Sequence, residues 1–73
     1  EEAEYRRHVV RQALQALRPE FPDRVWQAFW RYAVEGKEAG DVAASLGLRV
    51  GSVYAAKSRV LTRLREELAG LLD

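Results

Sequence analysis

The spacing of apolar residues along the chain predicts helices throughout and no strand. A first helix is expected at about 3–18, where apolar side chains recur at helical intervals and where Pro19 and Pro22 end the pattern. Its apolar stripe consists of Tyr5, Val9, Ala13, Leu14 and Leu17. Such a stripe is typical of an amphipathic helix that packs one face on a core.

A second helix is expected at about 23–35, with Asp23 available as its N-terminal cap and Gly36 as its end. A tryptophan pair one turn apart is more often core than a ligand site, so we expect Trp26 and Trp30 in the core. A partly exposed tryptophan that anchors a binding partner is the alternative. The broad apolar face of this helix consists of Val25, Trp26, Phe29, Trp30 and Ala33.

Residues 39–58, AGDVAASLGLRVGSVYAAKS, predict a helix-turn-helix, with a short helix at about 39–46 and a longer one at about 50–69. Ala43 is the small residue at the helix crossing, Gly47 the glycine of the turn, and Val53 the branched residue under the second helix. Gly47 can end the first helix because glycine adopts the left-handed conformation without steric cost. The remaining inward positions are Val42, Leu46, Leu48 and Ala56.

Apolar residues continue at helical spacing along the last helix, which Gly70 is expected to end. The chain has 73 residues, enough for one small domain at 1–73 whose core every helix must share. The predicted fold is all-α: a small four-helix bundle that contains a helix-turn-helix and has a long C-terminal recognition helix. The inward stripe of that helix is Val53, Ala56, Val60, Leu64, Leu68 and Leu71.

The net charge of +1 suggests no partner by itself, but the basic residues are unevenly distributed. Residues 49–65 contain five basic side chains and no acidic one. A run of this kind is usually a solvated helix face. Because it coincides with the second helix of the helix-turn-helix, we favour contact with the phosphates of double-stranded DNA. The five residues are Arg49, Lys57, Arg59, Arg63 and Arg65.

The outward side of this helix supplies the candidate DNA contacts. Side chains near the start of a recognition helix reach base edges in the major groove, where an arginine can hold a guanine with two hydrogen bonds. For Tyr54, packing on the neighbouring helix is an equally weighted alternative. The candidates for base contacts are Tyr54, Ala55, Ser58 and Arg59. The candidates for phosphate contacts, which orient the protein without reading sequence, are Lys37, Arg49, Ser52, Lys57 and Arg63.

The sequence offers no convincing set of catalytic or metal-binding residues. His8 is the single histidine, there is no cysteine, and the acidic residues are scattered over helix ends. We therefore expect no enzyme, and no metal, cofactor or small-molecule substrate. The apolar runs are too short to span a membrane and the acidic start is unlike a signal peptide, so we expect a soluble protein without membrane contact.

The stretch from Trp26 to Leu68 resembles region 4 of bacterial sigma-70-type factors of the extracytoplasmic-function class. The residues that carry the resemblance are WQAF, VEGKEAGDVAASLG and VGSVYAAKSRVLTRLREEL. The resemblance implies a domain that recognises the minus-35 promoter element with its last helix, while another surface docks on the β flap of RNA polymerase. It also implies a bacterial, cytoplasmic protein, with an anti-sigma factor as a further candidate partner. The groove-facing positions of the family correspond to Tyr54, Ala55, Ser58 and Arg59.

A complete sigma factor also has region 2, which this sequence lacks, so we expect the chain to be an excised domain. Two alternative functions stay open. The effector domain of a LuxR-type response regulator has a similar helix-turn-helix, but its second helix generally opens with threonine, arginine and glutamate, where this chain reads FPDRVWQAFW. A helical protein-interaction module, whose last helix binds an acidic partner, would show no salt-sensitive DNA binding.

Overall fold

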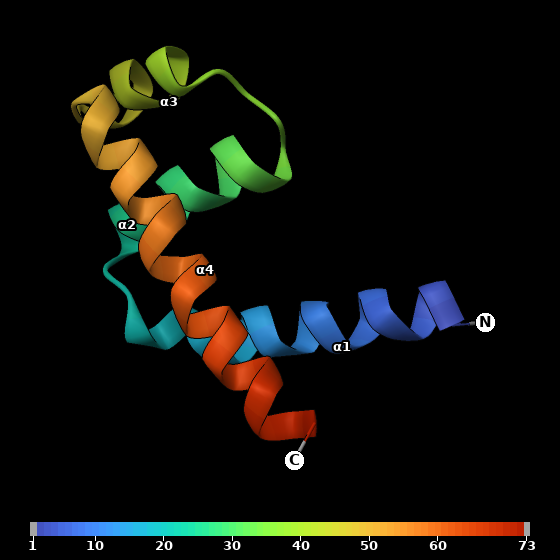
Figure 1. Ribbon diagram of the computed structural model, residues 1–73. Coiled ribbons are helices and arrows are strands. Elements are labelled where there is room, and N and C mark those ends of the chain that lie inside the picture. The colour runs from blue at the N-terminus through green and yellow to red at the C-terminus, as the bar shows by residue number, and fades with distance from the viewer. Residues whose placement is uncertain (1, 73) are drawn as a thin grey trace.

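Four α-helices and two short helical segments make up residues 2–72, the part of the chain that the computed structural model describes (Figure 1). The predicted all-α architecture with four helices is therefore confirmed for these residues. Two connections are themselves helical, because η1 is a 3-10 turn and η2 is a π-helical turn. In chain order the elements are α1 (Glu2–Leu17), η1 (Arg18–Glu20), α2 (Asp23–Phe29), η2 (Trp30–Val34), α3 (Ala39–Leu46) and α4 (Val50–Leu72).

The long helix α4 is the central element, and α1, α2 and α3 all pack against it. It can take this place because its apolar stripe is unbroken: Val53 and Val60 are fully buried, and Ala56 and Leu64 are buried with them. The expected inward residues of α3, Val42 and Ala43, are buried as well, while Leu46 and Leu48 pack on the edge of the core. The largest fully buried side chains are Phe29, Leu17, Val42, Val53 and Val60.

A left-handed glycine separates α3 from α4. Gly47 has φ 68° and ψ 35°, and the Leu48 N–H donates to the carbonyl of Ala43 at 2.8 Å. Any other residue at this position would carry the steric cost of the left-handed conformation. The expectation that Gly47 ends the helix is confirmed, and the chain turns sharply enough for α3 to pack beside α4.

The end of the second helix differs from the prediction because α2 passes into the π-helical turn η2. Here the Glu35 N–H donates to the carbonyl of Trp30 at 3.0 Å, five residues back instead of four. The longer turn rotates the following side chains relative to a regular α-helix. Ala33, expected on the apolar face, is consequently exposed, and Tyr32 is half-buried in its place.

Three further expectations about element ends and faces were wrong, and a fourth falls outside the described side chains. Asp23 is the first residue of α2 and makes no capping hydrogen bond; its carboxylate accepts one from Gln27 instead. Gly70 lies inside α4, which continues to Leu72. The side chain of Leu71 lies outside the described part. Tyr5 is 69% exposed, because the first half of α1 projects from the bundle (Figure 1).

Candidate nucleic-acid interface

The first half of α4 presents one face to solvent while its opposite face is buried in the core. Ser58 and Arg59 are exposed, one turn beyond the exposed Ala55, and Tyr54 is 52% exposed. Because α2 and α3 cover the opposite side, this outward face lies at the surface of the rigid bundle. The four candidate base contacts therefore share an exposed stretch of helix. None of them is hidden beneath the N-terminal helix.

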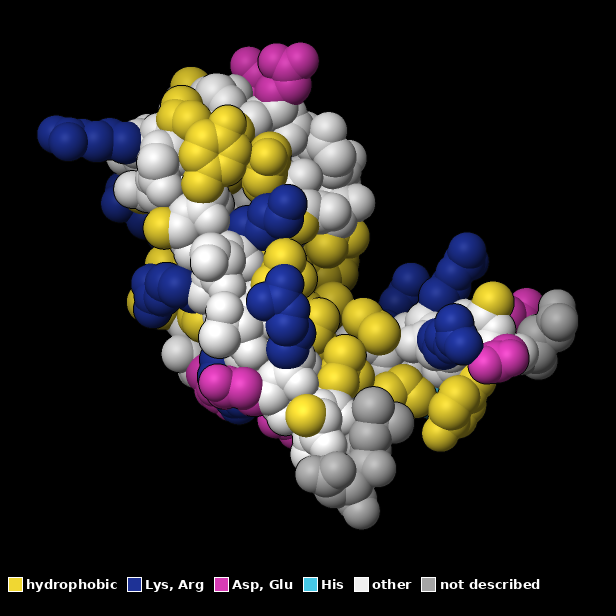
Figure 2. Space-filling model, in the orientation of Figure 1, with side chains coloured by type: hydrophobic (Ala, Val, Ile, Leu, Met, Phe, Trp, Pro, Cys, Tyr) yellow, Lys and Arg dark blue, Asp and Glu magenta, His cyan; other side chains and the backbone are white. Residues whose placement is uncertain are grey.

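Basic side chains follow this face along α4 (Figure 2). Arg49, in the turn before α4, and Lys57 are exposed, as is Ser52. Within residues 2–72 no ion pair involves Arg49, Lys57 or Arg59. The exposed Lys37 lies 3.3 Å from Glu35, an exposed surface pair of the kind that contributes little and exchanges readily with solvent. Arg49 and Lys57 thus lie on α4 or directly before it and are available to an anionic partner, whereas Lys37 lies in the loop before α3.

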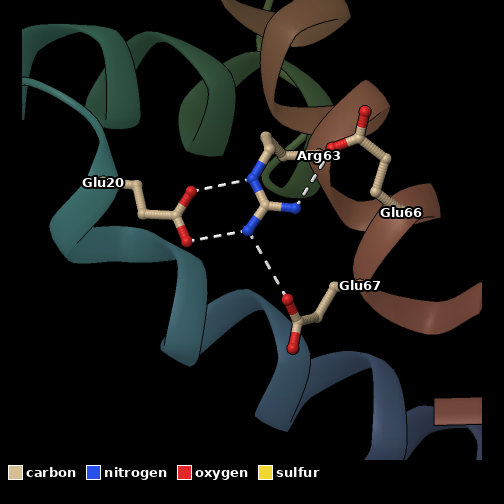
Figure 3. A network of polar contacts seen from close by, with 4 residues as sticks. All are labelled: Glu20, Arg63, Glu66 and Glu67. Carbon is tan, nitrogen blue, oxygen red and sulfur yellow. Dashed lines mark hydrogen bonds and ion pairs between the residues drawn. The ribbon is translucent and has the colours of Figure 1, made fainter. Parts of the chain in front are cut away.

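Arg63 differs from the other basic residues because carboxylates occupy its guanidinium (Figure 3). Its Nε and Nη2 each donate to one oxygen of Glu20 at 2.8 Å, a two-pronged ion pair that links α4 to η1. Glu66 and Glu67 approach the same guanidinium at 3.2 and 3.5 Å. We call this cluster of four residues the Arg63 clasp. Arg63 was predicted to contact phosphate, but in the structure its N–H groups donate hydrogen bonds to protein carboxylates.

The Arg63 clasp favours the ionised form of Glu20. Hydrogen bonds donated by Arg63 hold the pKa of Glu20 below its usual value of 4.5, and the same contacts raise the pKa of Arg63. A carboxylate with a depressed pKa stabilises the fold fully above its unfolded-state pKa, and that contribution is lost as the pH falls through its folded-state pKa. The clasp therefore stabilises the fold at neutral pH and not in strong acid.

We expect Glu20→Gln to lower the melting temperature at pH 7, and to lower it less once the pH is well below 4.5. The reason is that acid protonates Glu20 in the wild-type chain and makes the two proteins alike. Thermal unfolding followed by circular dichroism at both pH values measures the difference. Glu4→Gln, which removes an exposed carboxylate of α1 outside the clasp, is the matched control. A difference that stays constant with pH would contradict an electrostatic role for the clasp.

Sequence reasoning missed Arg24, a further cation beside the start of α4. Its guanidinium Nη2 lies 3.7 Å from the position that a Cβ of Gly47 would occupy. Together with Leu48, Ser52 and Arg59 it lines a shallow hollow on the protein surface. Arg24 is far from α4 in the sequence, and helical spacing within α2 gave no reason to single it out. Only the packing of α2 on α4 brings it to this face.

A second surface feature is a groove between α1 and the η2 turn. Its floor is apolar, with Val10 and Leu14 on one side and Trp30 and Val34 on the other. Its rim on α1 is basic, and Figure 2 shows dark-blue side chains on that arm of the molecule. The two tryptophans thus differ: Trp26 is a core residue, 5% exposed, whereas the partly buried Trp30 lines the groove. The rim arginines are Arg6, Arg7 and Arg11.

Within the described residues, no group of three or more side chains is arranged to hold a metal ion. Nor does any helix in this part of the chain combine the length and apolarity needed to cross a lipid bilayer. Comparison with protein-family models, with curated proteins and with solved structures found no match to this chain. The candidate interface therefore rests on its own geometry and charge.

Proposed function

We propose that this domain binds double-stranded promoter DNA through a helix-turn-helix formed by α3 and α4. The observation that carries the proposal is the outward face of α4, where exposed polar and cationic side chains lie opposite a buried apolar seam. The acid-free run of residues 49–65 gives this face the positive charge that attracts phosphates. Gly47 supports the proposal because its left-handed turn packs α3 beside α4, as the motif requires.

In this proposal the outward face enters the major groove. Arg59 holds a guanine through two guanidinium N–H groups, and the other three positions contact neighbouring base edges or a thymine methyl group. Phosphate contacts on both sides fix the orientation of the helix. The proposed base contacts are Tyr54, Ala55, Ser58 and Arg59. The proposed phosphate contacts are Lys37, Arg49, Ser52 and Lys57, to which we add Arg24 and from which we remove Arg63.

The role within transcription rests on the resemblance described above. We propose that the domain acts as region 4 of an alternative sigma factor, recognising the minus-35 element and directing transcription initiation in a bacterial cytoplasm. Such a domain must also dock on the β flap of RNA polymerase, and the groove between α1 and η2 is the surface that fits this task. Its apolar floor and basic rim suit an amphipathic helix with acidic flanks. An anti-sigma factor would compete for the same surface.

The salt dependence of DNA binding is the most direct test of this proposal. Four cationic phosphate contacts predict that the logarithm of the association constant falls with the logarithm of salt concentration at a slope of about −3.6, since each contact contributes about 0.9. Fluorescence anisotropy of labelled duplexes at several salt concentrations measures the slope. Arg7→Ala removes an exposed cation of α1, outside the outward face, and is expected to leave the slope unchanged.

A helical protein-interaction module is the second candidate function, and the groove between α1 and η2 favours it. This alternative predicts no binding to any duplex, whichever cations of the chain are present. Absence of salt-dependent DNA binding would therefore exclude our proposal and leave the interaction module. The effector domain of a response regulator shares the predicted DNA binding, and the sequence FPDRVWQAFW speaks against it.

A further inference from the structure

Two aromatic rings from outside α4 lie against the side chains of its outward face. Tyr32, in η2, meets the ring of Tyr54 edge to face, with 5.6 Å between centroids and 75° between planes. The Lys57 Nζ atom lies 5.4 Å from the centroid of the same Tyr32 ring. At the other side of the helix, the ring of Phe21 lies 5.8 Å from the guanidinium carbon of Arg59. Each ring therefore contacts a proposed base-reading residue.

Both rings are themselves held in place by the bundle. Phe21 packs on Trp26, with ring centroids 6.3 Å apart, and Trp26 is buried. Tyr32 is half-buried because the π-helical turn directs it toward α4. Turns of this type are rare and occur frequently at functional sites. The rings are thus fixed surfaces against which exposed side chains of α4 rest.

The way in which Arg59 is held leaves it able to bind a base. A carboxylate that accepts hydrogen bonds from a guanidinium occupies its N–H donors, as Glu20 does for Arg63. An aromatic ring attracts the cation through its π face and accepts no conventional hydrogen bond from it. Phe21 therefore restricts the rotamers of Arg59 while leaving its N–H donors for a ligand. Restricting a side chain before binding reduces the entropy that binding must overcome.

We propose that Phe21 and Tyr32 are positioning residues that hold Arg59 and Tyr54 in the conformations that read base pairs. This inference rests on the proposed DNA-binding function and extends it. Sequence specificity then depends on two residues that do not touch DNA: Phe21, which precedes α2 in the sequence, and Tyr32, which lies in η2. Loss of the Phe21 ring lowers discrimination between sequences and leaves general affinity for DNA nearly unchanged, because the phosphate contacts remain. Loss of the Tyr32 ring lowers discrimination in the same way, and a smaller loss of general affinity accompanies it because this ring also lies beside Lys57.

The test begins with selection of preferred duplexes by the wild-type chain from a pool with randomised base pairs. The Kd values for a selected duplex and for a scrambled duplex of equal composition are then measured by fluorescence anisotropy, and their ratio is the discrimination. Phe21→Leu and Tyr32→Leu are each expected to lower this ratio about two- to fivefold, the size expected from one aromatic contact. Phe21→Tyr and Tyr32→Phe keep the ring and should retain the ratio.

Tyr5→Leu is the matched control, since it removes an exposed aromatic ring on α1 and should leave the ratio unchanged. If Phe21→Leu and Tyr32→Leu leave the ratio unchanged, including by weakening both duplexes equally, the positioning role is overturned and the proposed DNA-binding function still stands. A wild-type chain that prefers no duplex would overturn the proposed function as well. If the leucine variants fail to fold, the NMR chemical shifts of the Arg59 Hδ protons in the wild-type chain test the contact instead. An upfield ring-current shift supports the contact with Phe21, and random-coil values overturn it.

Discussion

Arg59→Ala is expected to remove most of the discrimination between promoter sequences while the domain still binds DNA. Arg59 is exposed on the outward face, its guanidinium carbon lies 5.8 Å from the centroid of the Phe21 ring, and it forms no ion pair among the described residues. A guanidinium that holds a guanine with two hydrogen bonds contributes about 1–3 kcal/mol of discrimination against the wrong base. The Kd for the preferred duplex should therefore rise roughly five- to 150-fold, and that for a scrambled duplex much less.

Lys57→Ala is the natural comparison, because Lys57 is a cation of the same exposed helix two residues away. We assign it a phosphate contact, so its loss should weaken all duplexes alike and reduce the magnitude of the salt slope by about 0.9. Anisotropy titrations of both variants against the same pair of duplexes give the answer. Equal effects of the two substitutions on every sequence would refute the division into base and phosphate contacts.

Phe29→Ala is expected to remove a large part of the free energy of unfolding of the domain. The Phe29 ring is 2% exposed and packs on Trp26 with 5.3 Å between ring centroids. Deleting a buried phenylalanine ring costs about 3–5 kcal/mol, while a domain of this size has roughly 4–11 kcal/mol of total stability. Urea denaturation followed by tryptophan fluorescence measures the free energy of unfolding of both proteins, and the variant should retain only a fraction of the wild-type value or none.

An exposed aromatic residue provides the matched control for this core substitution. Tyr5 is 69% exposed on the projecting half of α1, and Tyr5→Ala should change the free energy of unfolding by no more than about 0.5 kcal/mol. Similar losses for Tyr5→Ala and Phe29→Ala would mean that the packing between α2 and α4 is not the main source of stability.

Helical periodicity predicted α3, α4 and most of the core because apolar residues recur at the same helical spacing over the whole length of these elements. The buried positions Val42, Val53 and Val60 follow directly from apolar spacing, and the left-handed turn follows from Gly47. Tyr5 continued the stripe of α1 in the sequence, yet it is exposed because no element lies opposite that end of the helix. Periodicity shows which face of a helix is apolar but not whether a partner covers it.

The candidate site could be predicted only where its residues lie on one helix. Tyr54, Ala55, Ser58 and Arg59 form one outward face because they belong to α4. Contacts between elements gave no comparable signal. Arg63 and Glu20 are 43 positions apart, so their ion pair could not be expected from spacing. Arg24, Phe21 and Tyr32 likewise reach α4 through the packing of α2 and η2.

The unbroken course of α4 has a mechanical consequence. Its first half carries the outward face, and its second half crosses α1 (Figure 1). In turn, α1 forms one wall of the groove. At a rise of about 1.5 Å per residue, the Cα atoms of Tyr54 and Leu64 lie roughly 15 Å apart along the axis of one continuous helix. The helix therefore fixes the distance and the relative rotation between a partner bound in the groove and a partner bound to the outward face.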